Sequence, residues 1–209
     1  MNQIKKALCF PVFLLWASTG QAENVKRLSE EPELAGKAHK LKLTVDIDVP
    51  IDHLWSVVGV NFDKSVRFNP AAVHTVYIDD RGTGPDIGSR RRTLDVKGRY
   101  IDVEITEFLQ DNHYVAWEII CTDVAKMEVA YSSYKLEEID SNKTRITQEA
   151  GFALSNPIMQ LAGKQMFPKI FLEELAVLKH TLENDVAKDD LSTSEYKKRY
   201  FPLINVNVL

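Results

Sequence analysis

The stretch KLKLTVDIDVP at residues 40–50 is the most informative part of the chain for the fold. From Leu41 to Val49 every second residue is aliphatic, and the residues between them are lysine, threonine or aspartate. A period of two predicts a β-strand with one buried face and one solvated face. We therefore expect a sheet that is covered on one side only.

Two short helices and six more strands are predicted after this strand. Pro50 suits a first helical turn, which predicts a helix over 51–60, and Asn69-Pro70 is expected to end a second short helix over 64–68. The short connections, among them a tight hairpin at Lys97-Gly98, favour antiparallel neighbours. The six further strands are predicted at 73–78, 89–96, 99–109, 114–121, 127–139 and 144–154.

The last helical region begins at Asn156-Pro157, and Pro168 predicts a break or kink before the main helix. That helix has an apolar stripe at helical spacing, formed by Phe171, Leu175, Leu178 and Leu182. A sheet that meets one lone helix must wrap around the helix to bury it. The predicted class is α+β: a seven-stranded curved antiparallel sheet around a long C-terminal helix, with a cavity between the two layers.

Residues 1–22 have the pattern of a signal peptide. Two lysines precede an apolar stretch over 7–17, and Ala22 lies at a suitable cleavage point. An uncleaved anchor is the alternative, but the stretch is shorter than the roughly 20 apolar residues of a membrane span. We expect a periplasmic or secreted protein with no stable membrane span, and leave transient contact with a membrane open.

The rest of the chain suits one domain. We predict a linker over 23–38, the folded domain over 39–186, and a C-terminal tail over 187–209 without firm structure. The formal net charge of −4 gives no reason to expect nucleic-acid binding. After cleavage Cys121 is the single cysteine, and the five histidines lack zinc-site spacing, so we expect no disulfide, no metal and no cofactor.

Several local patterns occur in the same order as in a known superfamily: Val49-Pro50 before Leu54-Trp55, Asn61-Phe62 before Asn69-Pro70, Gly88 before Arg92-Thr93-Leu94, and Ile105 to Phe108 before Trp117-Glu118-Ile119. Over residues 39–184 the chain resembles the START-like, or SRPBCC, superfamily, which includes birch-pollen allergen relatives. It is most similar to the branch of polyketide cyclases, dehydrases and lipid-transport proteins. The resemblance implies a helix-grip fold with a hydrophobic pocket.

The arginine run at 90–92 supplies the first candidate ligand contacts. Alternate residues of a strand point to opposite faces, so if Arg91 is outside, Arg90 and Arg92 are inside. A buried guanidinium would hold a carboxylate, phosphate or enolate of a ligand. The resemblance favours Arg92. The alternative is a solvated strand face with one arginine paired to Glu104 or Glu118.

Glu118 and a set of aromatic residues complete the predicted ligand site. A buried Glu118 could act as an acid or base with a shifted pKa, although such a residue more often faces solvent or pairs with arginine. The aromatic residues could line the pocket, and core packing is the alternative for each one. The set consists of Trp117, Tyr131, Tyr134, Phe152, Phe167 and Phe171.

No catalytic set is recognisable, and we predict no catalytic residue. The leading hypothesis is an exported START-like domain that binds a small hydrophobic ligand, such as a lipid, an isoprenoid or a polyketide-like compound, in its cavity. A cyclase-, aromatase- or hydrolase-type enzyme using the same pocket is one alternative. A periplasmic protein-interaction module is the other.

Overall fold

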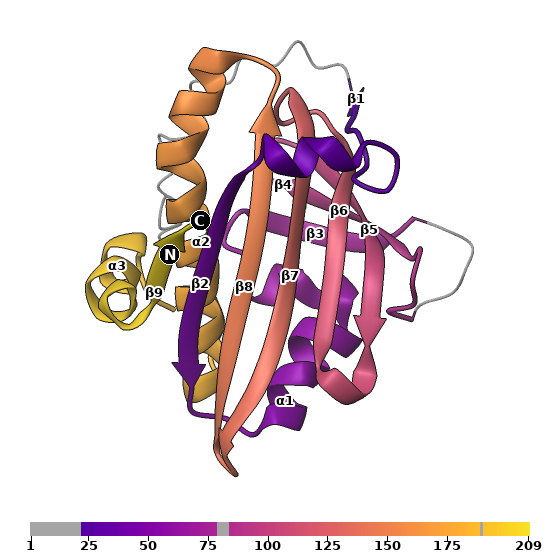
Figure 1. Ribbon diagram of the computed structural model, residues 1–209. Helices are drawn as coiled ribbons and strands as arrows, with labels where there is room; N and C mark the ends of the chain where they lie inside the picture. Colours follow the sequence, from indigo (N-terminus) through magenta and orange to yellow (C-terminus); the bar gives the residue numbers. More distant parts are fainter. Residues whose placement is uncertain (1–21, 79–83, 189) are drawn as a thin grey trace, which may run out of the picture.

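The computed structural model describes residues 22–78, 84–188 and 190–209. The predicted signal peptide therefore lies outside the described residues, apart from Ala22. Within them the chain forms a nine-stranded antiparallel sheet packed on the long helix α2 (Figure 1). The strands are β1 (Glu23–Asn24), β2 (His39–Ile47), β3 (Ala72–Tyr77), β4 (Arg90–Asp95), β5 (Tyr100–Leu109), β6 (Tyr114–Thr122), β7 (Met127–Asp140), β8 (Lys143–Leu154) and β9 (Asn205–Val208).

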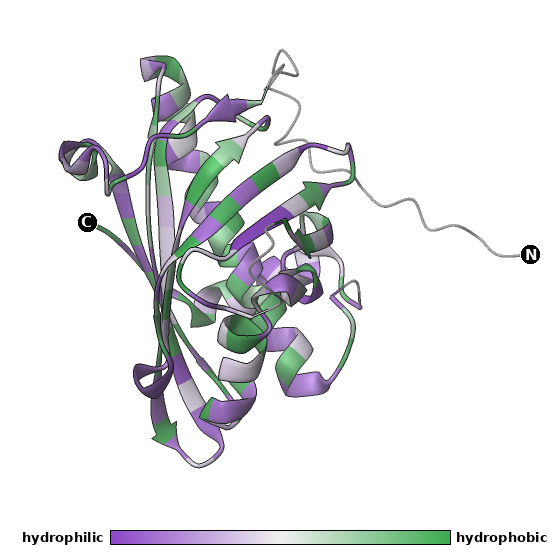
Figure 2. Cartoon of the chain, turned by 90° about the vertical axis from the view of Figure 1, so that its right-hand side faces the viewer, coloured by the Kyte–Doolittle hydropathy of each residue, from purple (hydrophilic) through white to green (hydrophobic). Residues whose placement is uncertain are grey.

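The order of the strands in the sheet is β3-β4-β5-β6-β7-β8-β2-β9, with β1 beside β6. The seven predicted strands correspond to β2 to β8, so the predicted sheet around a C-terminal helix is confirmed. Polar and apolar residues alternate along the strands, as the hydropathy colours in Figure 2 show. In β2 the four apolar residues from Leu41 to Ile47 are at most 1% exposed, so the alternation in the sequence corresponds to a strand with one fully buried face.

The two short helices predicted after β2 are also present. Helix α1 (Ile51–Trp55) continues into a π-helical turn over Ser56–Val60, and a 3-10 helix follows over Phe62–Arg67. A Cβ atom on Gly59 would lie 2.5 Å from the buried ring of Trp55. The packing of Trp55 therefore requires glycine at position 59.

Helix α2 (Pro157–Asn184) is continuous through Pro168, so the predicted break is absent. Proline removes one hydrogen bond of the helix backbone. Apolar contacts on both sides of Pro168 compensate for that loss, because Phe167 and Phe171 both pack against the hydrophobic core. Gly163 lets the helix approach the sheet, since a Cβ there would lie 3.0 Å from Phe152.

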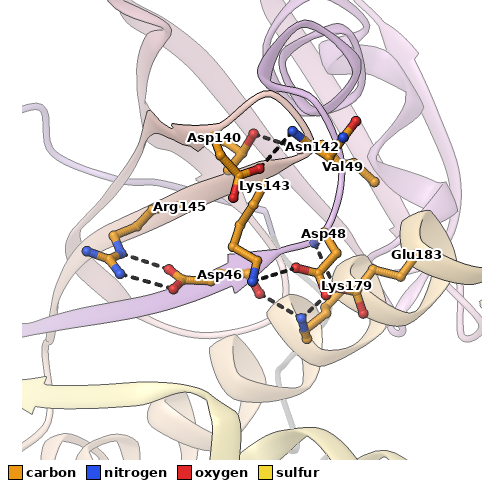
Figure 3. A network of polar contacts seen from close by, with 10 residues as sticks. Asp46, Asp48, Val49, Asp140, Asn142, Lys143, Arg145, Lys179 and Glu183 are labelled. Carbon is orange, nitrogen blue, oxygen red and sulfur yellow. Dashed lines mark hydrogen bonds and ion pairs between the residues drawn. The ribbon is translucent and has the colours of Figure 1, made fainter.

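Polar contacts fix the C-terminal half of α2 to the end of β2 (Figure 3). Lys179 Nζ donates to the backbone carbonyl of Asp46 at 2.7 Å, and the backbone N–H of Asp48 donates to Glu183 Oε1 at 2.8 Å. Both backbone groups lie beyond Thr44, the last residue of β2 that pairs with β9. The helix side chains thus satisfy backbone groups that β9 does not reach.

The C-terminal tail is structured, so the prediction of no firm structure over 187–209 was wrong. Helix α3 (Thr193–Tyr200) packs on α2, and β9 pairs with β2 at the sheet edge (Figure 1). The Tyr200 hydroxyl and His180 Nδ1 form a hydrogen bond of 2.7 Å. Tyr196 and Tyr200 flank the charged residues of this tail. Because they are four residues apart, they lie on the same buried side of α3.

The segment predicted as a linker, residues 23–38, also contacts the sheet. Strand β1 pairs with β6, and Leu34, in a 3-10 helix over Pro32–Gly36, packs with Val129 and Ala153. These residues form a small second cluster on the face of the sheet opposite α2. The outer face is therefore partly covered.

Candidate functional site

A cavity of about 200 Å³ lies between the inner face of the sheet and helix α2. Most of its wall is apolar, and strands β4 to β8 supply one side while α2 supplies the other. Five of the predicted site residues border it: Trp117, Tyr131, Phe152, Phe167 and Phe171. Arg90, Arg92, Glu118 and Tyr134 are not in its wall.

The aromatic side chains of the wall pack on one another. The ring centroids of Phe152 and Phe167 are 4.1 Å apart, and those of Phe167 and Phe171 are 6.3 Å apart. Trp117 meets Tyr134 edge-on at 5.0 Å. Tyr131 differs from the others, because its ring crosses Gly151 and packs with the outer-face cluster around Leu34.

A group of polar side chains lies on the inner face of the sheet and meets α2. Tyr134, which lies behind the wall, donates its hydroxyl to Glu174 Oε1 at 3.1 Å, and Gln148 also hydrogen-bonds the Glu174 carboxylate. Gln148 Nε2 donates to Ser132 Oγ at 3.4 Å. Arg91, Ser132, Gln148 and Glu174 all border the cavity, so an otherwise apolar space has one polar end.

Burial shifts the pKa of Arg91 and Glu174 at this polar end and of Tyr134 behind it. It lowers the pKa of Arg91 to about 10, against the opposing charge of Glu174. It raises the pKa of Glu174, opposed by the Tyr134 hydrogen bond and by Arg91, and it raises the pKa of Tyr134 well above its usual range. Arg91 and Glu174 therefore offset each other's charge in a poorly solvated place.

The arginine run faces the opposite way from the prediction. Arg91 is buried and opposes Val103 across the strand pair, whereas Arg90 pairs with Glu104 and Arg92 with Asp102 on the outer face. The Arg92 fork donates two hydrogen bonds to Asp102, at 2.7 and 2.8 Å. Arg90 and Arg92 are thus fixed by acidic side chains outside the cavity.

The hairpin register explains this reversal. A two-residue loop at Lys97-Gly98 would place Arg92 opposite Val103, on the inner face. The loop has a third residue, because the backbone of Asp95 bonds to Arg99 and Gly98 takes the positive φ of 76° that closes such a turn. A shift of one residue moves every side chain of a strand to the other face.

Glu118 also lies outside the cavity. It faces the covered outer side of the sheet, directly opposite Glu104, and its Oε2 atom has no hydrogen-bond partner among the described residues. Burial raises its pKa, against a hydrogen bond from the Leu28 backbone and the charge of Arg27. Glu118 is therefore a buried carboxylate with a raised pKa, but it lies on the outer face of the sheet beneath the N-terminal segment and not in the cavity.

Glu118→Gln is expected to stabilise the protein by about 1 kcal/mol at neutral pH, because burial disfavours the ionised carboxylate and its Oε2 atom has no hydrogen-bond partner among the described residues. Because folding raises the pKa of Glu118, its ionisation costs stability as pH rises through the folded-state pKa. The gain should vanish near pH ~4, below the ordinary glutamate pKa. Urea unfolding at both pH values measures it.

Glu104→Gln is the matched control for that substitution, because Glu104 accepts hydrogen bonds from Arg27 and Arg90. This variant should lose stability at neutral pH. A Glu118→Gln protein that is less stable than the wild type at neutral pH would contradict the expectation.

Sequence patterns that were available could have identified two of the missed residues. Glu174 lies three residues after Phe171 and four before Leu178, on the helical stripe that was assigned from apolar residues alone. Gln148 lies between Ile146 and Ala150 in the alternation of β8, where an inward polar residue breaks the pattern. A polar residue at an inward position is the signal for such a site.

A second hollow, of about 630 Å³, lies between β2, β9 and α2. Charged and amide groups line it, and its ions pair with one another: Arg145 binds Asp46 at 2.7 Å and Lys143 binds Asp48 at 3.2 Å (Figure 3). These contacts hold the sheet edge together. The apolar cavity is therefore the better candidate for a ligand site.

A curved sheet, one long gripped helix and an apolar space between them define a helix-grip protein with an internal cavity. The model of the family described as polyketide cyclase/dehydrase and lipid transport matches residues 38–183. The chain belongs to this family of the SRPBCC superfamily. A search of curated proteins found no match.

Solved structures share this fold at low sequence identity. XoxI from Bacillus cereus is 14% identical with a TM-score of 0.58, and the match covers 70% of this chain and 96% of XoxI. A Thermobifida fusca protein is 14% identical with a TM-score of 0.56, covering 69% and 95%. Norcoclaurine synthase from Thalictrum flavum, in complex with dopamine and hydroxybenzaldehyde, is 12% identical with a TM-score of 0.52, covering 69% and 86%.

Proposed function

We propose that this protein is an exported helix-grip domain that binds a small hydrophobic molecule in the cavity between its sheet and α2. The observation that carries the proposal is the cavity itself, which has an apolar wall and one polar end at Arg91, Gln148 and Glu174. Such a combination is typical of sites that bury a ligand and orient it with a few polar groups. The signal-peptide pattern at residues 1–22 supports export.

None of the helices within the described ranges is long and apolar enough to cross a bilayer. A carrier or a sensor is the role we favour, because a cavity of this kind buries a ligand without needing a catalytic set.

A substitution that fills the cavity with a larger side chain tests the proposal. Ala130 borders the cavity and is 6% exposed, so Ala130→Leu places three additional carbon atoms in that space. We expect the affinity for naphthalene, measured by calorimetric titration, to fall at least about tenfold while stability changes by less than about 1 kcal/mol.

Ala153→Leu is the matched control, because Ala153 is equally buried but packs with Leu34 and Val129 on the other face. It should lose about 1–3 kcal/mol by overpacking and bind naphthalene like the wild type. Native mass spectrometry of gently purified protein would identify a natural cargo. A wild-type protein that carries no compound and binds no naphthalene would contradict the proposal.

An enzyme of the cyclase or aromatase kind is the second candidate. It is favoured by the raised pKa values of Glu174 and Tyr134, which share a hydrogen bond beside the cavity and could hold or move a proton. Glu174 and Tyr134 replace Arg92 and Glu118 as the groups for such chemistry. Glu174→Gln that keeps ligand binding but loses turnover would separate an enzyme from a carrier.

A further inference from the structure

One polar atom at the inner end of the cavity lacks a partner. Gln148 is 1% exposed, and its Oε1 atom has no hydrogen-bond partner among the described residues. A buried acceptor without a donor costs about 1–3 kcal/mol. Because Gln148 borders the cavity, a ligand in that space could supply the missing donor.

The orientation of the Gln148 amide follows from its neighbours. The Glu174 carboxylate accepts hydrogen bonds, so the group that meets it is the Gln148 nitrogen. The same nitrogen also faces Ser132 Oγ, which in turn donates to the backbone carbonyl of Glu149 at 3.1 Å. These contacts engage the amide nitrogen and leave the oxygen as the acceptor without a partner among the described residues.

The charges around this atom balance. Arg91 and Glu174 both border the cavity, and each stabilises the charged form of the other. A ligand ion would meet a like charge as well as an opposite one, and moving an ion out of water costs several kcal/mol. The polar end therefore favours a neutral head group.

The volume sets the size of the ligand. An apolar cavity of about 150 Å³ holds benzene, and drug-sized ligands occupy about 300–1,000 Å³. The space here is about 200 Å³, which fits one or two rings. It is too small for a lipid with two acyl chains.

We propose that the cavity takes a neutral molecule of one or two rings whose hydroxyl group donates a hydrogen bond to Gln148 Oε1, that is, a phenol or a cyclic alcohol. This inference rests on the proposed function and specifies the class of ligand. Aromatic walls formed by Trp117, Phe152 and Phe167 would pack on the rings.

Four naphthyl compounds with one ring system and different substituents test the inference by calorimetric titration: naphthalene, 2-methoxynaphthalene, 2-naphthol and 2-naphthoate. The wild-type protein should bind 2-naphthol about tenfold more tightly than naphthalene or the methoxy compound, which lacks the donor, and more tightly than the charged 2-naphthoate. In Gln148→Leu the preference for 2-naphthol over naphthalene should fall to about twofold or less.

Thr144→Val is the matched control, since Thr144 is a fully buried polar residue on the same face of β8, where its hydroxyl donates to the Val49 carbonyl. It should keep the preference for 2-naphthol. Equal affinity for naphthalene and 2-naphthol, a preference that persists in Gln148→Leu, or tightest binding of 2-naphthoate would each overturn the inference and leave the proposed function standing. If none of the four compounds binds the wild type, the inference fails, and the proposed function fails with it if the gently purified protein also carries no compound.

Discussion

Phe152→Ala is expected to lower the free energy of unfolding by about 3–5 kcal/mol, the usual cost of removing a buried phenylalanine. Phe152 is 2% exposed and lies between β8 and α2, with its ring 4.1 Å from that of Phe167. A domain of this size is stable by only about 5–15 kcal/mol, so the loss should be large in urea unfolding.

The same substitution should make the protein more responsive to an apolar ligand, because Phe152 borders the cavity and its removal enlarges that space. Saturating naphthalene should therefore restore more stability to Phe152→Ala than it adds to the wild type. Phe152→Leu, which keeps most of the volume, should lose less than about 1.5 kcal/mol. A loss below about 1 kcal/mol for Phe152→Ala would show that this contact does not hold the helix to the sheet.

A chain that ends at Val186 is expected to lose about 3 kcal/mol or more, because the removed segment buries three apolar side chains, each worth about 1.5–3 kcal/mol before the cost of ordering the chain. They are Tyr196, Tyr200 and Ile204, which all belong to the main core. The hydrogen bond between His180 and Tyr200 is lost as well. Urea unfolding of the shortened protein measures the effect.

A chain that ends at Ile204 is the control for this truncation. It lacks only residues 205–209, whose side chains are all exposed, and should lose less stability than the chain ending at Val186, because it gives up only the backbone pairing of β9 with β2. If the chain ending at Val186 unfolds at the same urea concentration as the full-length protein, the tail does not contribute to the stability of the domain. That result would favour the alternative of a protein-interaction module that uses the tail.

The ionisable groups in and beside the cavity come from separate elements, so no local sequence motif contains them together. Arg91 comes from β4, Tyr134 from β7 and Glu174 from α2. Glu174 is adjacent to neither in the sequence, yet it accepts the Tyr134 hydroxyl at 3.1 Å. Only the closing of the sheet on α2 brings Arg91 and Glu174 to one end of the cavity and Tyr134 to the Glu174 carboxylate behind it.

Local patterns in the sequence specify the order of the elements and the fold class. Alternation along β2, the turn residues between later strands and the helical stripe through Phe171 and Leu178 are local patterns, and each element carries its own. The aromatic wall could also be predicted in large part, because bulky apolar residues at inward positions are buried between the sheet and the helix. These features depend on which residues are near in the chain.

Which arginine enters the cavity, and where the segments before β2 and after α2 pack, depend on contacts between residues far apart in the chain. The loop between β4 and β5 has three residues instead of two, and that single residue moved Arg91 inward and Arg92 to Asp102. Residues 23–38 and 187–209 have weak local patterns, and the described residues among them are held by contacts with distant surfaces of the sheet and α2. Register and docking depend on energy differences between distant partners, which no local pattern contains.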